Sequence, residues 1–112
     1  MNALTSDELL HAIETMDGWV LAVSEVPGKE GRQRRELEKV YEFASFEDAM
    51  DFMATAAGHI SRVDHHPRWE NRFRTVTVWL STWSAGHKPS QLDVALAQFM
   101  DSLYASYEDP KK

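Results

Sequence analysis

Apolar residues recur with the period of an amphipathic helix near both ends of the chain. Thr5 and Glu8 have the spacing of a capping box, and the periodic residues that follow predict a helix over residues 6–16. Ser90 and Asp93 have the same spacing, and they precede a periodic run that predicts the last helix of the chain. For Asp93 the residues favour this helix cap as the interpretation, because a cap explains the carboxylate without any ligand.

The most regular helical pattern lies in the middle of the chain. Ser45 can cap its first turn, and apolar residues then follow at helical spacing. Pro67 excludes helical geometry at His66, so this helix should end near Val63 or Asp64. A pair of adjacent histidines therefore lies at the exit of this helix.

Four other stretches are rich in β-branched and aromatic residues, as strands are. The predicted strands cover residues 19–26, 36–43, 69–73 and 75–81. Residues 29–35 are polar and contain glycine, so we predict a hairpin loop there. The second strand alternates an apolar with a polar face, formed by Leu37, Tyr41 and Phe43 and by Glu36, Glu38 and Glu42.

The predicted elements follow the order helix, strand, strand, helix, strand, strand, helix. Strands joined by hairpins pair antiparallel, so the predicted fold class is α+β, with a four-stranded antiparallel sheet and helices packed on one face. The other face would carry glutamate, threonine and tryptophan, and sheets this short often continue across a subunit boundary. We therefore predict one domain over residues 1–112 that assembles as a homo-oligomer.

Composition narrows the choice of partners. The 112 residues include 12 Lys and Arg against 18 Asp and Glu, a net charge of -6. Binding to phosphate depends on basic side chains, so we expect no direct nucleic-acid partner and no membrane partner. The chain has no cysteine, which excludes disulfides and thiolate chemistry. Its first residues lack the basic segment and apolar core of a secretory signal, so we expect a cytoplasmic protein.

The densest group of titratable side chains is Asp64-His65-His66, which precedes Pro67 and Trp69. Imidazole titrates near neutral pH and can both accept and donate a proton during turnover. Taken alone, the residues favour a solvated helix end, where a histidine complements the helix dipole.

A metal site is the alternative use of the histidines. Adjacent histidines such as His65 and His66 point in different directions, and His59 and His65 lack the i,i+4 spacing that places two imidazoles on one helical face. His87 would have to complete the site. We therefore predict no metal site, and the chain has neither a glycine-flanked nucleophilic serine nor a glycine-rich phosphate loop.

A longer pattern surrounds the histidine pair and extends over nearly the whole chain. It comprises Asp64-His65-His66-Pro67-Arg68-Trp69-Glu70-Asn71, Phe73, Val76, Val78, Leu80-Ser81-Thr82, Asp93 within Leu92-Asp93-Val94-Ala95-Leu96-Ala97, and, upstream, Gly18-Trp19, Tyr41-Glu42-Phe43, Phe46, Ala49 and Phe52-Met53. This pattern resembles the pterin-4a-carbinolamine dehydratase family. The spacing of His-His-Pro, the aromatic residues and the aspartate makes the resemblance specific.

The resemblance implies the α+β fold predicted above, assembled as dimers or tetramers. It also implies a hydro-lyase that dehydrates 4a-hydroxytetrahydropterin (4a-hydroxytetrahydrobiopterin) to quinonoid dihydropterin during tetrahydrobiopterin recycling. No metal or organic cofactor is implied, because the pterin is the substrate.

The matching motif implies site residues as well. His65 would be the acid/base nearest the 4a-hydroxyl, and His66 would orient the pterin. The implied substrate pocket has one wall from Asp64, His65, His66 and Trp69 and another from Ser81, Thr82, Trp83 and Ser84. Trp19 and Trp79 are predicted to be packing residues, and the basic cluster Arg32, Arg34 and Arg35 is predicted to be a solvated loop.

Two positions depart from the pattern of the family. Trp83 stands where most relatives have a third active-site histidine, and Ser61 stands where a charged residue is usual. Tryptophan cannot transfer protons at neutral pH, although it can stack on a pterin ring. The segment from Trp83 to Asp93 is one residue longer than in most relatives and contains His87. Two imidazoles would then have to carry out the proton transfers for which most relatives have three, unless His87 folds back toward the site.

These departures keep a second function open, that of a catalytically weak protein that binds a partner. Relatives in the family serve as a dimerisation cofactor for a homeodomain transcription factor, and degenerate members act as assembly factors for the carbon-fixing carboxylase. Trp83 and Ser61 favour this alternative, whereas His65-His66-Pro67 favours the enzyme. Broader pterin chemistry, such as a role around the molybdenum cofactor, is a third possibility.

Overall fold

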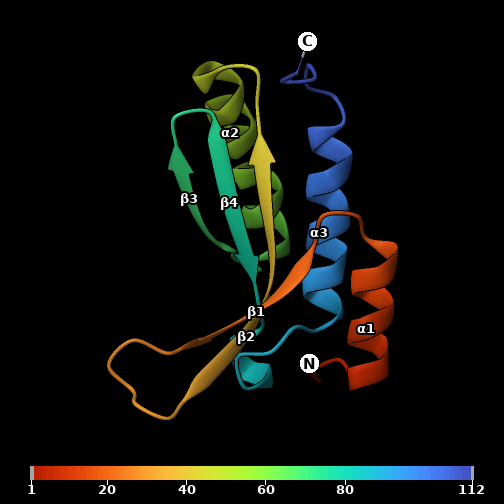
Figure 1. The fold of residues 1–112 in the computed structure, drawn as a ribbon, viewed down its shortest axis with the longest axis vertical. Coiled ribbons are helices and arrows are strands. Elements are labelled where there is room, and N and C mark those ends of the chain that lie inside the picture. Colours follow the sequence, from red (N-terminus) through yellow and green to blue (C-terminus); the bar gives the residue numbers. More distant parts are fainter. Residues whose placement is uncertain (1, 112) are drawn as a thin grey trace.

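The computed structural model describes residues 2–111 and contains three α-helices, four strands and one short 3-10 helix among them (Figure 1). In chain order the elements are α1 (Ser6–Thr15), β1 (Val20–Glu25), β2 (Gln33–Glu42), α2 (Phe46–Val63), β3 (Arg68–Arg72), β4 (Thr75–Leu80), η1 (Trp83–Ala85) and α3 (Gln91–Tyr104). All the predicted helices and strands are present, with small shifts at their ends. No helix among these residues is long and apolar enough to cross a membrane.

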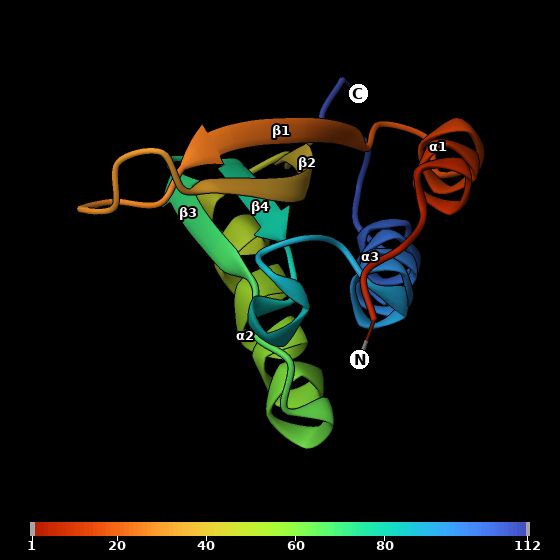
Figure 2. The same ribbon diagram turned by 90° about the horizontal axis from the view of Figure 1, so that it is seen from below.

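The four strands form one antiparallel sheet in the order β1-β2-β4-β3. α2 and α3 lie on one side of this sheet, and α1 lies beside α3 (Figure 2). These features confirm the predicted α+β fold. β2 is the longest strand, and it pairs with β1 through residues 33–38 and with β4 through residues 37–42. The β1–β2 hairpin therefore extends beyond the rest of the sheet (Figure 1).

The helices begin where their caps predict. Thr5 and Glu8 form a reciprocal capping box at α1, and the hydrogen bonds from Thr5 lower the pKa of Glu8. The hydroxyl of Ser45 accepts a hydrogen bond from the backbone N–H of Asp48 at the start of α2. A second capping box starts α3, and Ser90 is its N-cap residue.

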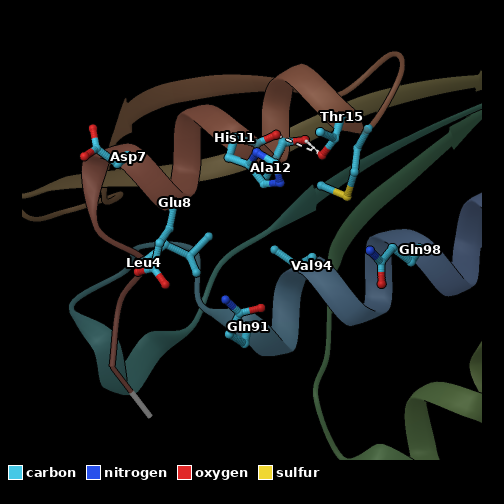
Figure 3. Close-up of a pocket in the computed structure, with 10 residues that line it drawn as sticks. Leu4, Asp7, Glu8, His11, Ala12, Thr15, Gln91, Val94 and Gln98 are labelled. Atoms are coloured by element: carbon cyan, nitrogen blue, oxygen red, sulfur yellow. Dashed lines mark hydrogen bonds between the residues drawn. The ribbon is translucent and has the colours of Figure 1, made fainter.

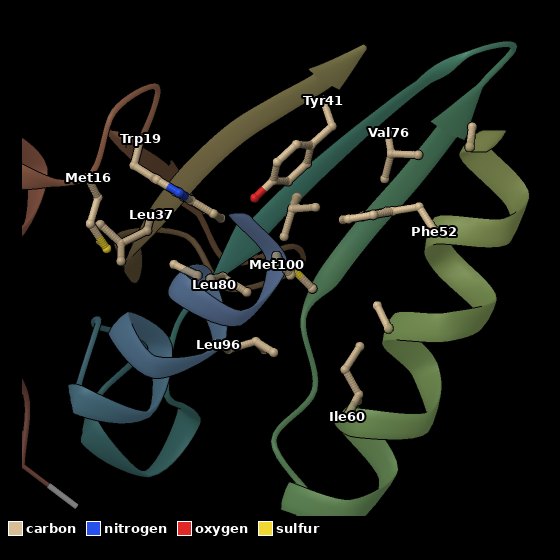
Figure 4. Close-up of a cluster of buried hydrophobic side chains, with 14 of the residues drawn as sticks. Met16, Trp19, Leu37, Tyr41, Phe52, Ile60, Val76, Leu80, Leu96 and Met100 are labelled. Carbon is tan, nitrogen blue, oxygen red and sulfur yellow. The ribbon is translucent and has the colours of Figure 1, made fainter. Parts of the chain in front are cut away.

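The core lies between the sheet and the helices (Figure 4). It consists of the buried residues Ala12, Met16, Trp19, Leu37, Tyr41, Phe43, Ala49, Phe52, Ala56, Ile60, Val76, Val78, Leu80, Leu96, Ala97 and Met100. The predicted apolar face of the second strand is thus confirmed, although Phe43 lies just beyond the end of β2. Each large aliphatic or aromatic side chain buried here contributes about 1.5–3 kcal/mol by leaving water.

One carboxylate joins three parts of this core. Asp101 of α3 accepts hydrogen bonds from Trp19 Nε1 (3.0 Å), Lys39 Nζ (2.8 Å) and the Tyr41 hydroxyl (2.6 Å). Burial raises the pKa of Tyr41, and the hydrogen bond to Asp101 raises it further. Asp101 therefore attaches α3 to β2 and to the residue that precedes β1.

One prediction about the first hairpin needs correction. β2 begins at Gln33, so the last three residues of the predicted loop belong to the strand, where Ser24 pairs with Arg34. Glu36 lies on the predicted polar face, yet it is only 3% exposed, because two arginine side chains cover it. Strand pairing uses the backbone, which explains why polar side chains did not end the strand earlier.

Candidate functional site

The histidine pair leaves α2 through a reversal of the backbone. Asp64 is the C-cap residue and has left-handed geometry (φ 51°, ψ 44°), a conformation that aspartate tolerates better than most residues. Pro67 then leads into β3, as the sequence predicts. The reversal directs His65 and His66 to different surroundings.

His65 is bound to a buried carboxylate. Its Nε2 lies 2.6 Å from Oδ1 of Asp93, whose side chain is fully buried, and only 13% of the His65 side chain is exposed. The other carboxylate oxygen, Oδ2, accepts hydrogen bonds from the Thr82 hydroxyl (2.7 Å) and from the backbone N–H of Ser90 (2.8 Å). A carboxylate can only accept, so Nε2 of His65 carries a proton and Nδ1 is the ring nitrogen left for chemistry.

Asp93 therefore has two functions in this chain. It completes the capping box of α3, as predicted, and it also fixes the orientation and tautomer of His65. The interpretation of Asp93 as a cap alone was incomplete. The hydroxyls of Thr82 and Ser90 lie 2.6 Å apart and complete this buried network.

His66 points toward solvent rather than toward α3. Its side chain is 65% exposed, and its Nε2 lies 3.2 Å from Oδ1 of Asp64, which is itself 91% exposed. His66 also lines a cavity of about 280 Å³. The residues around this cavity come from β2, the connection from α2 to β3, the first residue of β3, the end of β4 and the segment after β4. They are Arg34, Glu36, His66, Pro67, Arg68, Trp79, Ser81, Trp83 and His87.

Charged and aromatic side chains on the outer face of the sheet form part of this cavity. Arg68 donates two hydrogen bonds to Glu36 (2.8 and 3.2 Å), and its guanidinium lies 4.0 Å from the ring centroid of Trp79. Arg34 donates to Ser24 (2.8 Å) and lies 3.4 Å from Glu36. Such pairing satisfies the buried carboxylate and orders the arginines.

The structure brings together some of the predicted site residues and separates others. His66, Ser81 and Trp83 line the cavity, whereas His65 is not among its lining residues, and Thr82 holds the carboxylate that binds His65. Asp64 contacts His66 from the solvent side. Ser84 is exposed within η1 and is not among the residues that line the cavity.

The structure places two tryptophans near the site differently from the prediction. Trp69 packs against the hydrophobic core and does not line the cavity, whereas Trp79, predicted as a packing residue, does line it. In β4 the buried residues are Val76, Val78 and Leu80, so Trp79 necessarily faces away from the helices.

Sequence reasoning also missed Arg34, Glu36 and Arg68 as part of the cavity. Arg34 was assigned to a solvated loop, but it lies in β2 and is partly buried. The signal that could have found Arg68 is its register position, because it lies directly opposite Trp79 in the β3–β4 pair.

A larger groove of about 430 Å³ lies between α1 and α3 (Figure 3). Asp7, Glu8 and His11 line it from α1, and Gln91 and Gln98 line it from α3. None of its lining residues belongs to the histidine motif or to the network around Asp93. Its size alone carries no chemistry, so the smaller cavity is the candidate site.

The histidines considered for a metal site lie in separate surroundings. His59 stacks on Phe99 with ring centroids 3.7 Å apart, His65 binds Asp93, and His87 contacts Trp83. Among residues 2–111, no group of three or more His, Asp or Glu side chains is arranged to hold a metal ion.

The fold and the site together define a small α+β protein that holds one histidine on a buried carboxylate beside a polar cavity. The model of the Pterin 4 alpha carbinolamine dehydratase family matches residues 2–103, so the chain belongs to this family. A protein of Opitutus terrae, provisionally named a pterin-4-alpha-carbinolamine dehydratase, is 35% identical over 89% of this chain and 92% of its own length.

A relative in Brucella ovis with the same provisional name is 33% identical over 91% of this chain and 95% of its own length. Among solved structures, a protein from Brucella melitensis described as a transcriptional coactivator/pterin dehydratase is similar, with a TM-score of 0.75 and 33% identity. The match covers 92% of this chain and 99% of that one. These likenesses confirm the family and the fold that the sequence indicates.

Proposed function

We propose that this protein dehydrates a 4a-hydroxytetrahydropterin to the quinonoid dihydropterin and water, the reaction of tetrahydrobiopterin recycling. The observation that carries the proposal is the 2.6 Å contact between His65 Nε2 and the buried Asp93, next to the cavity that His66 lines. An imidazole held by a carboxylate is a common arrangement for general acid–base catalysis.

For this dehydration the protein must bind a flat ring and transfer protons. The departing 4a-hydroxyl needs a proton, and ring N5 must lose one. In the proposed reaction, Nδ1 of His65 supplies the first proton, since Nε2 is bound to Asp93. His66 orients the pterin, and Trp83, whose side chain lies at the cavity, offers an indole on which the ring can stack. The reaction proposed in this way needs no metal and no organic cofactor.

The test is the dehydration of the 4a-carbinolamine by purified protein, followed by absorbance against the uncatalysed rate. We expect clear acceleration, and we expect His65→Ala to lower kcat by about 100-fold or more, the usual contribution of a general acid–base group. His11→Ala is the matched control, because His11 lies in the α1–α3 groove. A parent rate no higher than the uncatalysed rate would refute the proposal.

A second candidate function is the binding of a protein partner with little catalysis. Two observations favour it: Trp83 is 70% exposed at the cavity, and the similar protein from Brucella melitensis is described as a transcriptional coactivator as well as a pterin dehydratase. Under this alternative the carbinolamine assay would show no acceleration, while Trp83→Ala would abolish binding of the partner.

We also propose that the protein is a homo-oligomer. Within residues 2–111, β1 and β3 are the outer strands of the sheet, and each can pair with the same strand of a second copy. Sedimentation at micromolar concentration tests this proposal, and a monomer alone would contradict it.

A further inference from the structure

The side chain of His87 carries an unusual ring nitrogen. Its Nε2 is buried, and it is the one buried side-chain nitrogen or oxygen in residues 2–111 that has no hydrogen-bond partner. A buried polar atom without a partner loses its hydrogen bonds to water and gains none, so such atoms are rare in folded proteins. A nitrogen kept in this state at the edge of a cavity indicates a ligand that supplies the missing partner.

The backbone of His87 is held in place in spite of strain. Its φ is 58°, in the left-handed region, which is unfavourable for a residue with a side chain. Its carbonyl accepts the N–H of Arg35 (2.8 Å), and the N–H of Thr82 donates to the carbonyl of the neighbouring Lys88 (3.0 Å). Thr82 also binds Asp93, so His87 is fixed relative to the carboxylate that orients His65.

Trp83 contacts the imidazole of His87. The two rings meet edge to face with centroids 4.0 Å apart, and both residues line the cavity that contains His66. Both also line an adjoining cavity of about 320 Å³ with Arg32 and Gly86. The exposed indole of Trp83 forms no hydrogen bond among the described residues, so it can turn toward a flat ligand and uncover Nε2.

We propose that His87 is a second imidazole that contacts the substrate, and that it accepts the proton from ring N5. This inference rests on the proposed dehydratase function. The C4a–O bond breaks as His65 delivers a proton to the hydroxyl, which leaves as water. The C4a=N5 double bond forms, and the proton on N5 passes to Nε2 of His87. Exchange with solvent then returns a proton to His65 and removes one from His87.

Two substitutions separate this function from a structural one. His87→Phe keeps a ring against Trp83 and removes the unsatisfied nitrogen, so we expect an unchanged or higher Tm together with a kcat at least tenfold lower. His87→Gln keeps a hydrogen-bonding group but cannot take up a proton. We expect its KM to stay within threefold of the parent while its kcat falls at least tenfold. His11→Phe, made in the α1–α3 groove, is the control.

The results overturn the inference if kcat of His87→Phe falls less than tenfold, or if the pH profile of kcat is the same in His87→Gln as in the parent. If the parent itself gives no acceleration, the proposed function fails, and the contact is tested by binding alone. Quenching of tryptophan fluorescence by 7,8-dihydrobiopterin then serves as the probe. A Kd at least fivefold weaker in His87→Phe supports the contact, and a smaller change refutes it.

Discussion

Replacing Asp93 with asparagine tests the link between the cap of α3 and the chemistry of His65. Aspartate accepts from His65 at Oδ1 and from Thr82 and the Ser90 N–H at Oδ2. Asparagine has one acceptor oxygen and one donor NH2 group. If the amide oxygen keeps the two hydrogen bonds from Thr82 and from the Ser90 N–H, the NH2 group faces Nε2 of His65. That nitrogen must then give up its proton and accept, so the proton moves to Nδ1.

The size of both effects follows from this geometry. The hydrogen bond from His65 to a charged acceptor is lost, and such bonds contribute about 1.5–3 kcal/mol when the acceptor is buried. We expect a loss of about 2 kcal/mol in the free energy of unfolding, which lowers the Tm of a chain of this size by roughly 8 °C. The changed tautomer should lower kcat by about 100-fold or more, because a ring whose Nε2 carries no proton cannot deliver the proton on Nδ1 without becoming an imidazolate anion.

Dehydration of the 4a-carbinolamine measures kcat, and 15N NMR of the imidazole measures the tautomer directly. Glu8→Gln is the matched control, since Glu8 is the corresponding residue in the capping box of α1 and lines the α1–α3 groove rather than the cavity that contains His66. It should change stability slightly and leave kcat unaltered. If Asp93→Asn is folded and keeps kcat within threefold of the parent, Asp93 does not orient a catalytic His65, and our reasoning is wrong.

Two further predictions concern the core. Asp101→Asn should lower the free energy of unfolding by about 2–3 kcal/mol, because it removes the negative charge that accepts hydrogen bonds from Lys39 and Tyr41. Urea titrations measure this change, and a loss below about 0.5 kcal/mol would contradict the prediction. Burial and the hydrogen bond to Asp101 raise the pKa of Tyr41 in the folded state. The protonated phenol therefore contributes stability that is complete below about pH 10, the pKa of tyrosine in the unfolded chain. This contribution is lost as pH rises from there toward the folded pKa. Between pH 10 and 11.5, Tyr41→Phe should therefore make the decline in stability shallower by about 1.4 kcal/mol per pH unit, and parallel slopes in parent and variant would refute this.

Most of the fold could be predicted from the sequence because local signals agree with the packing. The capping pairs at Thr5 and Ser90 mark the starts of α1 and α3, and the alternation of β2 identifies the face that meets the helices. The hairpin was less predictable. Gln33 begins β2 although its neighbours are polar, since the ladder with β1 is built from backbone groups that composition does not reveal.

The site could be located from the sequence, but its geometry could not be derived. The His-His-Pro motif placed His65 and His66 at a helix exit, and the structure agrees. The partner of His65 lies 28 residues further along the chain, and no local rule connects the two. The cavity wall was also hidden, because the sequence places Trp79 on the outer face of the sheet but does not reveal that Arg68 lies opposite it in the β3–β4 pair.

The network around Asp93 explains why the fold and the candidate site are difficult to separate. The same carboxylate closes the first turn of α3, binds Thr82 beyond the end of β4 and holds the imidazole at the exit of α2. A shift of any of these three elements would displace His65, so the packing of the fold sets the position of the proposed acid. Preorganisation of this kind fixes the orientation of a proton donor before a substrate binds. It also implies that substitutions that loosen the start of α3 should reduce catalysis before they unfold the chain.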